Sequence, residues 1–359
     1  MDSSFPTPPS RFSLPEVSLI VPARNEESSL GACLESLTAQ SGVAFEIIVV
    51  DDASSDRTRE IAQSFPGVRV ISADSPPPDR PAKTWTGKNN ALVAGTREAR
   101  APWLLFTDAD TIHQTGSLAR ALDEAKREQA DLLSYSPDQV AVTFAERAVM
   151  PVVFAELAAR YPLNPVRDRS CESAAANGQY ILVRRTAYDA AGGHAAVGAE
   201  ILEDVALARR FCQAARRVRF RYGGDAVRTR MYRNWAELRE GWTKNLALLF
   251  PRSGILAIQS FALWLAVWSS LAIALAGALT QHVLWILSAA LSLLAYRRIR
   301  AAHFRASDNW MALGFGLPLF AYLLLRSKQA HRNGRVLWKG RAYHVGVESD
   351  GAQPEKKAA

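Results

Sequence analysis

Two aspartates one residue apart, Asp108 and Asp110, follow directly on the apolar run 103–107. A buried strand that ends in paired carboxylates offers the oxygen ligands that hard cations such as Mg²⁺ and Mn²⁺ prefer. Such cations are commonly shared with substrate phosphates, so the pair points to a diphosphate ligand. A surface turn with two solvated aspartates is the alternative interpretation, and further residues are needed to choose between them.

Carboxylates also follow two apolar runs near the N-terminus. Asp51 comes directly after residues 47–50, the apolar part of the run 46–50, and Glu26 follows the run 17–21 after a short polar stretch. A carboxylate that an apolar strand aims at a cleft can accept hydrogen bonds from a nucleobase N–H or from ribose hydroxyls. Stabilisation of a helix N-terminus remains the alternative interpretation for Glu26.

A third acidic pair, Glu203 and Asp204, stands at the start of a helical segment that carries Val205, Leu207 and Ala208. A carboxylate that faces a metal-bound diphosphate can act as general base on an acceptor hydroxyl. Adjacent carboxylates at a helix N-terminus are also stabilised there whatever their function. Both interpretations stay open at this point.

Basic and aromatic residues offer contacts to phosphates. Lys88 stands at a helix start, where a cation opposes the helix dipole, so an anionic partner such as a diphosphate would explain its position. A solvated lysine on a loop is the alternative. Arg230, Arg233 and Trp242 either close over a phosphate leaving group, with arginine making bidentate contacts, or anchor at lipid headgroups. Their spacing does not separate these two roles.

These residues fall at the ends of alternating strands and helices. The predicted strands are 17–21, 46–50, 68–72 and 103–107, and the predicted helices are 27–39, 56–65 and 88–99. This alternation, with uninterrupted apolar strands, is typical of an α/β fold whose mainly parallel sheet has helices on both faces. Ligands bind such sheets outside the carboxyl ends of the strands. We therefore expect one binding edge, formed by the polar clusters 22–27, 51–56, 73–88 and 108–110.

The chain changes character near residue 253. Residues 255–279 carry no charge and would form a helix of roughly 37 Å, which is long enough to cross a bilayer. The shorter apolar stretches 282–296 and 310–325 are further transmembrane candidates. The expected regions are a disordered tail at 1–15, a catalytic domain at 16–250, a transmembrane region at 251–330 and a basic tail at 331–359.

Charge and cysteine content bear on partners and compartment. The formal net charge is +8, and the basic excess flanks the apolar segments, which favours a membrane surface over nucleic acid. Cys33, Cys171 and Cys212 are odd in number and far apart, so we expect no disulfide framework and a reducing compartment. The positive-inside bias makes the arginines at 297–305 cytosolic. The expected location is the cell (inner) membrane, multi-pass, with the catalytic domain in the cytosol.

Taken in order, these motifs resemble those of the family 2 glycosyltransferases, which have the GT-A (nucleotide-diphospho-sugar transferase) fold. The matching stretches are 17–27, 48–56, 87–88, 108–110, 177–180 and 203–204. Within that family the chain looks most like the membrane-attached lipid glycosyltransferases of the hopanoid-associated, carotenoid and ceramide-glucosyltransferase-like type. The resemblance implies inverting transfer of a sugar from a nucleotide-diphosphate sugar, such as a UDP-sugar, to a lipid hydroxyl, with Mg²⁺ or Mn²⁺ as cofactor.

The resemblance also implies roles for individual residues. Those that would bind the donor nucleotide are Pro22, Arg24, Glu26, Asp51, Lys88 and Asp108. Asp110, with Asp108, would bind the metal, and Asp204 would be the general base, with Glu203 beside it. The residues that would contact the acceptor or close over the diphosphate are Gly178, Gln179, Arg230, Arg233 and Trp242.

One departure from the family pattern limits the implied activity. Family members commonly carry a Gln-x-x-Arg-Trp motif after the base, whereas the stretch 230–235 lacks the glutamine and displaces the tryptophan by one. This difference argues against a processive, polymer-making enzyme. Two alternatives remain: a sugar-phosphate nucleotidyltransferase, and a non-catalytic membrane scaffold with a glycosyltransferase-like shell.

Overall fold

The computed structural model describes residues 14–73, 85–161, 171–276, 282–334, 336–338 and 341–343. They form two compact units: unit 1 holds the described residues of 1–141 and 156–231, and unit 2 those of 142–155 and 232–359. Most of the expected tail 1–15, of the polar cluster 73–88 and of the basic tail 331–359 lies outside the described residues. The domain boundary expected near residue 250 stays a prediction.

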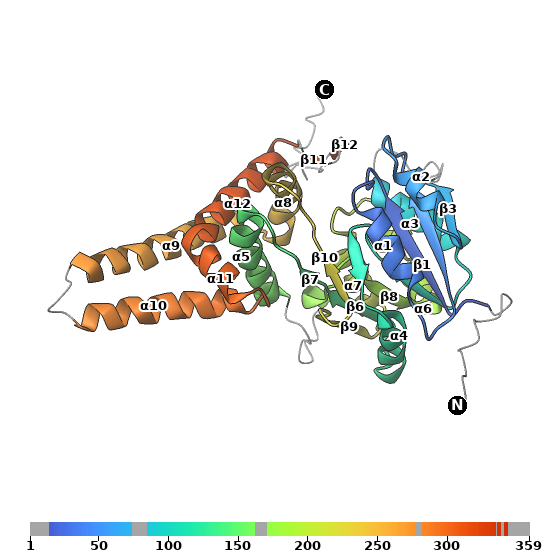
Figure 1. Ribbon diagram of the computed structural model, residues 1–359, viewed down its shortest axis with the longest axis horizontal. Coiled ribbons are helices and arrows are strands. Elements are labelled where there is room, and N and C mark those ends of the chain that lie inside the picture. Colours follow the sequence, from blue (N-terminus) through green and yellow to red (C-terminus); the bar gives the residue numbers. More distant parts are fainter. Residues whose placement is uncertain are drawn as a thin grey trace, which may run out of the picture. The chain divides into compact units, whose positions relative to one another are not determined.

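A seven-stranded sheet organises unit 1, with the strand order β3-β2-β1-β4-β8-β6-β9 (Figure 1). The strands are β1 (Val17–Ala23), β2 (Phe45–Asp51), β3 (Val68–Ser72), β4 (Trp103–Phe106), β6 (Leu132–Ser136), β8 (Ile181–Arg184) and β9 (Val218–Tyr222). The first four strands pair in parallel, as do β6 and β9, whereas β8 runs antiparallel to both of its neighbours. The predicted mainly parallel sheet is therefore confirmed, with one antiparallel strand inserted.

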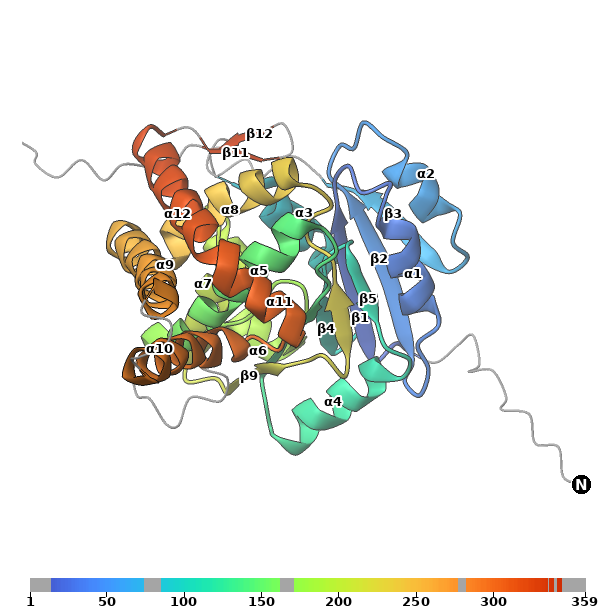
Figure 2. The same cartoon turned by 60° about the vertical axis from the view of Figure 1, so that its left-hand side comes forward.

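The central strands are buried on both faces, which accounts for their uninterrupted apolar runs. In β1, Leu19 and Val21 belong to one buried cluster and Ile20 to another, because successive side chains point to opposite faces. Figure 2 shows helices on both sides of the sheet. The first face is covered by α1 (Leu30–Thr38), α2 (Thr58–Gln63) and α4 (Ser117–Arg127), and the second by α3 (Gly87–Glu98), α6 (Arg185–Ala190) and α7 (Glu203–Gln213).

A small second sheet supports the loop that carries the paired aspartates. It consists of β5 (Thr111–His113), β10 (Val227–Thr229) and β7 (Asp138–Gln139), in the order β5-β10-β7. Thr229 of β10 stands opposite Thr111 on one side and beside Gln139 on the other. Three distant parts of the chain therefore meet next to the loop between β4 and β5.

The expectation of unpaired cysteines is wrong for two of the three. Cys171 and Cys212 form a disulfide that joins the 3₁₀ turn η2 (Cys171–Ser173) to α7, and Cys33 is a buried free thiol. The partners are 41 residues apart in sequence, so their spacing gave no sign of the pairing. Because disulfides persist mainly in oxidising environments, the cysteines no longer support a reducing compartment.

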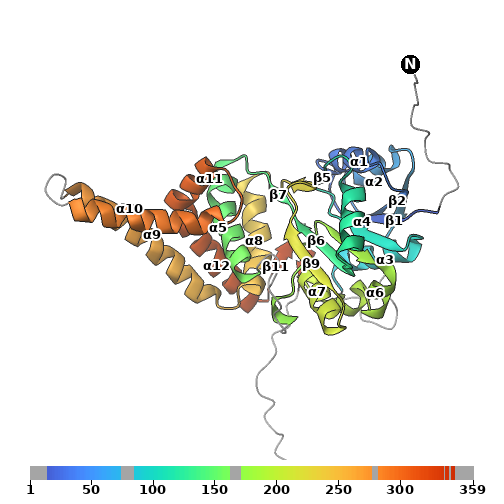
Figure 3. The ribbon, with the colours of Figure 1, turned by 90° about the horizontal axis from the view of Figure 1, so that it is seen from below.

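Unit 2 is mainly helical. It contains the start of α5 (Phe144–Arg160), followed by α8 (Trp235–Leu249), α9 (Ser253–Ala276), α10 (His282–Arg300), α11 (Ala306–Met311), the π-helical turn η4 (Ala312–Gly316) and α12 (Leu317–Arg332). A short hairpin of β11 (Val336–Trp338) and β12 (Arg341–Tyr343) ends the described chain. Helices α9 and α10 run side by side, and α12 packs along α8 and α9 (Figure 3).

Three helical segments of unit 2 have the length and composition to cross a membrane: Ser253–Ala276, His282–Arg300 and Ala306–Arg332. They correspond to the apolar stretches that the sequence indicated. In the most apolar part of the first two, only 17% of the residues are buried, against 50% in the third. Most apolar side chains of α9 and α10 therefore point outward, as expected for helices that contact lipid.

Candidate active site

The loop between β4 and β5 carries Asp108 and Asp110 and is fixed through its backbone. Thr111 Oγ1 donates a hydrogen bond to the carbonyl of Asp108 at 2.8 Å, and Thr229 Oγ1 donates to the carbonyl of Asp110 at 3.1 Å. Thr107 Oγ1, one residue before the pair, donates to the carbonyl of Gln179 at 2.8 Å. The aspartate carboxylates are thus presented from a loop that the neighbouring elements hold in place.

His113 completes this buried network. Its Nε2 lies 3.0 Å from Thr107 Oγ1 and 3.1 Å from Thr111 Oγ1. Burial lowers the pKa of His113 to about 3, so the imidazole is neutral under the aspartate loop at physiological pH. His113 therefore stabilises the loop through hydrogen bonds and carries no charge there.

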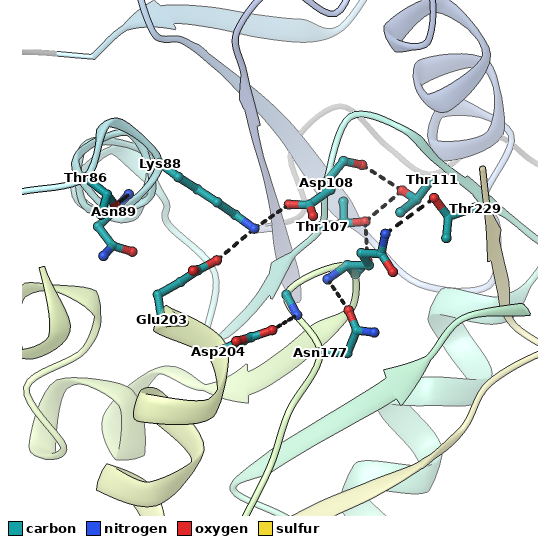
Figure 4. A network of polar contacts seen from close by, with 12 residues as sticks. Thr86, Lys88, Asn89, Thr107, Asp108, Thr111, Asn177, Glu203, Asp204 and Thr229 are labelled. Carbon is teal, nitrogen blue, oxygen red and sulfur yellow. Dashed lines mark hydrogen bonds and ion pairs between the residues drawn. The ribbon is translucent and has the colours of Figure 1, made fainter. Parts of the chain in front are cut away.

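Lys88 connects the aspartate loop to the second acidic pair (Figure 4). Its Nζ lies 2.8 Å from Asp108 Oδ1 and 2.8 Å from Glu203 Oε1. Burial opposes a charge on Lys88, but the two carboxylates outweigh it and raise the lysine pKa well above its usual range. The lysine that the helix dipole disfavours thus has two anionic partners within the chain.

Asp204 lies in the first turn of α7 and is held by two backbone donors. Its Oδ2 accepts from the N–H of Gly178 at 2.9 Å, and its Oδ1 accepts from the N–H of Val205 at 2.8 Å. Burial and the like charge of Glu203 raise the pKa of Asp204 to about 6, although Lys88 and the backbone donors act in the opposite direction. A carboxylate with this pKa is ionised at neutral pH and is a stronger base than an exposed aspartate.

Gly178 lies against this charged group. A Cβ built at this position would be 3.0 Å from Lys88 Nζ, 3.3 Å from Glu203 Oε1 and 3.6 Å from Asp204 Oδ2. The neighbouring Gln179 is buried, and its Nε2 lies 3.4 Å from Thr229 Oγ1. The backbone of 178 thus contacts the acidic pair of α7, whereas the side chain of 179 bonds to the small sheet that supports the aspartate loop.

Four of the predicted donor-binding residues, Pro22, Arg24, Glu26 and Asp51, lie at or just beyond the carboxyl ends of β1 and β2. In the register of these strands Ala23 stands beside Asp51, and Pro22 beside Val50. Asp51 is buried, and its Oδ1 accepts from the N–H of Ser54 at 3.2 Å. Because β4 pairs in parallel with β1, this edge of the sheet is the one from which the aspartate loop leaves.

Arg24 and Glu26 sit where β1 leaves the sheet. Arg24 Nη1 donates to the carbonyl of Asp52 at 2.7 Å, and Glu26 Oε2 accepts from Ser29 Oγ at 2.9 Å, beside the start of α1. Asn25 and Ala53 both adopt positive φ, 51° and 53°, a conformation that non-glycine residues rarely take. Backbone strain of this kind is concentrated at binding sites, where the surrounding structure enforces it.

Three residues predicted to contact the acceptor or close over the diphosphate are not part of the network around Lys88. Arg230 is half-buried near the end of unit 1, and Arg233 is exposed at the start of unit 2 with its N–H donating to Glu237 Oε2. Trp242 is buried within unit 2, where its ring packs edge-on against those of Phe154 and Tyr232. Its contacts are those of a core residue of unit 2, and its proposed part in closure over a phosphate stays a prediction.

The sequence interpretation missed Asn89 and the threonine network. Thr107, Thr111 and His113 surround the aspartates in sequence, and polar residues in an otherwise apolar strand-and-loop segment were an available signal. Asn89 directly follows Lys88 and is fully buried. Its partners lie more than 100 positions away in the chain, so no local pattern revealed them.

Comparison with known sequences found one matching family model and similar curated enzymes. Residues 18–189 match the family model described as glycosyl transferase family 2. The chain is 28% identical to the 4,4'-diaponeurosporenoate glycosyltransferase of Staphylococcus aureus strain USA300, over 94% of this chain and 90% of that enzyme.

Two solved structures resemble the chain at lower identity. A mannosyltransferase of Pyrobaculum calidifontis, in complex with GDP-Man and Mn²⁺, is 17% identical with a TM-score of 0.49, over 89% of this chain and 87% of that one. Residues 1–349 of S. aureus TarS, in complex with UDP-GlcNAc, are 14% identical with a TM-score of 0.45, over 93% of this chain and 100% of that one.

Proposed function

We propose that this glycosyltransferase, which matches the model of glycosyl transferase family 2 over residues 18–189, transfers a sugar from a nucleotide-diphosphate sugar, of the UDP-sugar class, to a lipid acceptor at a membrane. The reaction is a single displacement that inverts the anomeric carbon. It adds one sugar and is not processive, in keeping with the missing glutamine and displaced tryptophan of the stretch 230–235.

One observation carries this proposal: Lys88 Nζ lies 2.8 Å from both Asp108 Oδ1 and Glu203 Oε1. These ion pairs join the loop at the carboxyl end of β4 to the first turn of α7. A donor whose diphosphate lies beside Asp108 therefore carries its sugar next to the acidic pair of α7. The remaining donor contacts are assigned to the β1–β2 edge, with Pro22, Arg24, Glu26 and Asp51 around the nucleoside.

Asp204 is the general base in this proposal. The acceptor oxygen forms a bond to the anomeric carbon while the bond from that carbon to the diphosphate oxygen breaks, and the hydroxyl proton passes to Asp204. Its carboxylate is oriented by the N–H groups of Gly178 and Val205 before the substrate arrives. Lys88 supplies fixed positive charge where the leaving diphosphate gains negative charge.

Asp108 and Asp110 are the residues that would hold Mg²⁺ or Mn²⁺. Among the residues that the structure describes, no group of three or more His, Cys, Asp or Glu side chains could hold a metal ion. A pair of carboxylates still fits such a cation, because Mg²⁺ is usually bound by one or two carboxylates together with substrate phosphates. When bound, the cation would neutralise the departing diphosphate as a Lewis acid.

The lipid nature of the acceptor is supported by two observations. The S. aureus relative is named for its action on 4,4'-diaponeurosporenoate, and unit 2 carries three helices that are apolar enough to cross a membrane. We assign the multi-pass protein to the cell (inner) membrane, with the catalytic domain and the segment near Gly340 on the cytosolic side. This orientation requires that one of the three apolar helices does not fully cross the membrane, and the Cys171–Cys212 disulfide argues against it because disulfides are rare in the cytosol. Labelling of a cysteine introduced at position 340 only from outside intact cells would refute this orientation.

A lipid carboxylate is the second candidate acceptor. The name of the S. aureus relative denotes a carboxylate, which needs no base to remove a proton before attack. The raised pKa of Asp204 favours a hydroxyl, since a base matched to neutral pH is useful only when the acceptor carries a proton. Mild alkali distinguishes the two products, because it cleaves a glycosyl ester and leaves a glycoside intact.

Transfer of label tests the function directly. Membranes that contain the protein are incubated with radiolabelled UDP-glucose, UDP-GlcNAc or GDP-mannose, and the lipids are then extracted. We expect label in a new lipid band with one donor, and no such band with membranes that contain the Asp204→Asn variant. Equal labelling in membranes without the protein would contradict the proposal. Release of the label as a sugar 1-phosphate when pyrophosphate is added would favour a nucleotidyltransferase.

A further inference from the structure

Asn89 links two elements that the proposed reaction must keep in register. It lies in the first turn of α3, directly after Lys88, and its side chain is fully buried. Its Nδ2 donates to three carbonyl oxygens: Val197 O at 2.9 Å, Gly198 O at 3.0 Å and Glu200 O at 3.1 Å. Since an amide nitrogen has two N–H groups, three carbonyls share two donors, and the amide orientation is fixed.

Further contacts join the same two segments. The N–H of Thr86, the N-cap of α3, donates to Gly198 O at 3.0 Å, and Thr86 Oγ1 accepts from the N–H of Asn89 at 3.1 Å. A Cβ on Gly198 would lie 2.6 Å from the ring of Trp85, so the backbone there packs directly against the indole. The start of α3 and the segment 197–200 are therefore interlocked.

Each interlocked segment contains or closely precedes, in sequence, a charged residue of the site. Lys88 lies between Thr86 and Asn89 in the first turn of α3, while Glu203 and Asp204 begin α7 three residues after the segment 197–200. We propose that Asn89 is a positioning residue, which holds α3 and α7 in the register at which Lys88 reaches both Asp108 and Glu203. This inference rests on the proposed function. Asn89 acts on the reaction through Lys88 and the acidic pair and touches neither donor nor acceptor.

We call the three hydrogen bonds from Asn89 Nδ2 to the segment 197–200 the clamp. Two substitutions remove the clamp in different ways. Asn89→Asp keeps the shape of the side chain but places a carboxylate oxygen against three carbonyls. The second carboxylate oxygen, at the place of Asn89 Oδ1, gains no hydrogen bond in return, because Oδ1 is buried without a hydrogen-bond partner among the described residues. Asn89→Ala removes the donor without adding a charge. This variant replaces Asn89→Asp in the experiment if the aspartate variant does not fold. Thr96→Val, on the same helix, is the matched control. Thr96 Oγ1 donates to Leu92 O within the helix and lies 3.5 Å from Tyr188 Oη, and neither partner belongs to the segment 197–200.

Steady-state kinetics separate a positioning role from donor binding. With the full-length protein in membranes, we expect the Asn89 variants to lower kcat about 10- to 100-fold, because displacement of a catalytic group by about 1 Å has this effect. The donor KM should rise by a smaller factor than kcat falls, because Lys88 is displaced rather than removed, and Thr96→Val should match the wild type in both. An equal loss in donor affinity and kcat, or an unchanged kcat, would overturn the inference.

Hydrogen exchange tests the clamp without reference to activity. In Asn89→Ala, amides of 197–205 should exchange faster than in the wild type, while those of β1 and β2 should not change. Unchanged exchange at 197–205 would refute the clamp whatever the kinetics. If the wild type transfers no sugar from any donor, the proposed function fails, and the exchange data still decide whether Asn89 holds the two segments together.

Discussion

The N–H of Gly178 donates to Asp204 Oδ2 at 2.9 Å, so the residue assigned as base is held by a position that carries no side chain. The same position has Lys88 Nζ and Glu203 Oε1 within 3.3 Å of where a Cβ would stand. A backbone that approaches a charged cluster this closely needs glycine for steric reasons rather than for its conformational freedom.

The first prediction therefore concerns Gly178→Ala. We expect kcat to fall about 10- to 100-fold, because the added methyl displaces Lys88 or the acidic pair from their present positions. Gly31→Ala is the matched control: its Cβ would meet only Ile61 Cγ2, at 3.9 Å, and it lies within α1. That variant should keep its activity and gain about 0.5–1 kcal/mol in stability. Full activity in Gly178→Ala would show that the cluster tolerates displacement.

A second prediction follows from the pKa of Asp204, which burial and Glu203 raise to about 6. The ionised form is needed as base, so kcat/KM should rise with pH through about 6 and then level off. Asp204→Asn should lower kcat by about 10²- to 10⁴-fold and remove this limb of the profile. A profile that is flat between pH 5 and 7 would argue against Asp204 as base.

The same shift has a consequence for stability. Between the ordinary pKa of 3.8 and about 6, the folded protein keeps a proton on Asp204 that the unfolded chain has released. The contribution of Asp204 to the free energy of unfolding therefore falls as pH rises through this window. Thermal melts should show Asp204→Asn gaining stability relative to the wild type at pH 7 but not at pH 4.

The third prediction uses Lys88, whose positive charge acts to lower the pKa of Asp204. In Lys88→Gln the acidic limb of kcat/KM should move to higher pH, and the donor KM should rise because the diphosphate loses a cation. Lys126→Gln provides the comparison, since Lys126 is half-exposed on α4 and pairs with Glu16 at 3.5 Å. Kinetics of Lys126→Gln should match the wild type, and a Lys88→Gln profile with an unshifted limb would contradict the coupling.

Metal removal gives a fourth prediction. Chelation by EDTA should abolish transfer, and Mg²⁺ or Mn²⁺ should restore it, because two carboxylates and a diphosphate can share one hard cation. Asp110→Asn should raise the metal concentration needed for half-maximal activity, whereas Asp123→Asn, exposed on α4, should not. Transfer that persists in EDTA would remove the metal from the proposal and leave Lys88 as the cation at the diphosphate.

The disulfide gives a fifth prediction. Denatured without reductant, the protein should show one reactive thiol, from Cys33, and three after reduction. Replacing Cys171 and Cys212 by serine should lower the free energy of unfolding by about 2–4 kcal/mol, because the bond closes a long loop. Intact-mass measurement after alkylation counts the thiols, and three reactive thiols without reductant would contradict the pairing.

Local pattern predicted the framework of the site well. The runs that became β1, β2 and β4 are buried on both faces, so their apolar character is continuous and their polar ends are easy to find. Once these strands pair in parallel, their carboxyl ends must share an edge, and this is why Asp51 and the loop of Asp108 belong to the same region of unit 1.

What the sequence could not show depends on partners that are distant in the chain. The role of Asn89 depends on the segment 197–200, which lies more than 100 residues away in the chain. The pairing of Cys171 with Cys212 also has no local sequence signal. The antiparallel insertion of β8 likewise depends on pairing with β4 and β6 rather than on its own composition. Trp242 appeared suited to an interface by its neighbours in sequence, but its burial is set by Phe154 and Tyr232.

The π-helical turn at Ala312–Gly316 couples two of the apolar helices. The indole Nε1 of Trp264, in α9, donates to the carbonyl of Gly314 at 2.8 Å. In hydrocarbon a backbone carbonyl without a donor is costly, since no water is present to replace one. In the proposed membrane the irregular helix therefore reaches its relaxed form only when α9 is already beside it, and we expect the two segments to enter the bilayer as a pair rather than one at a time.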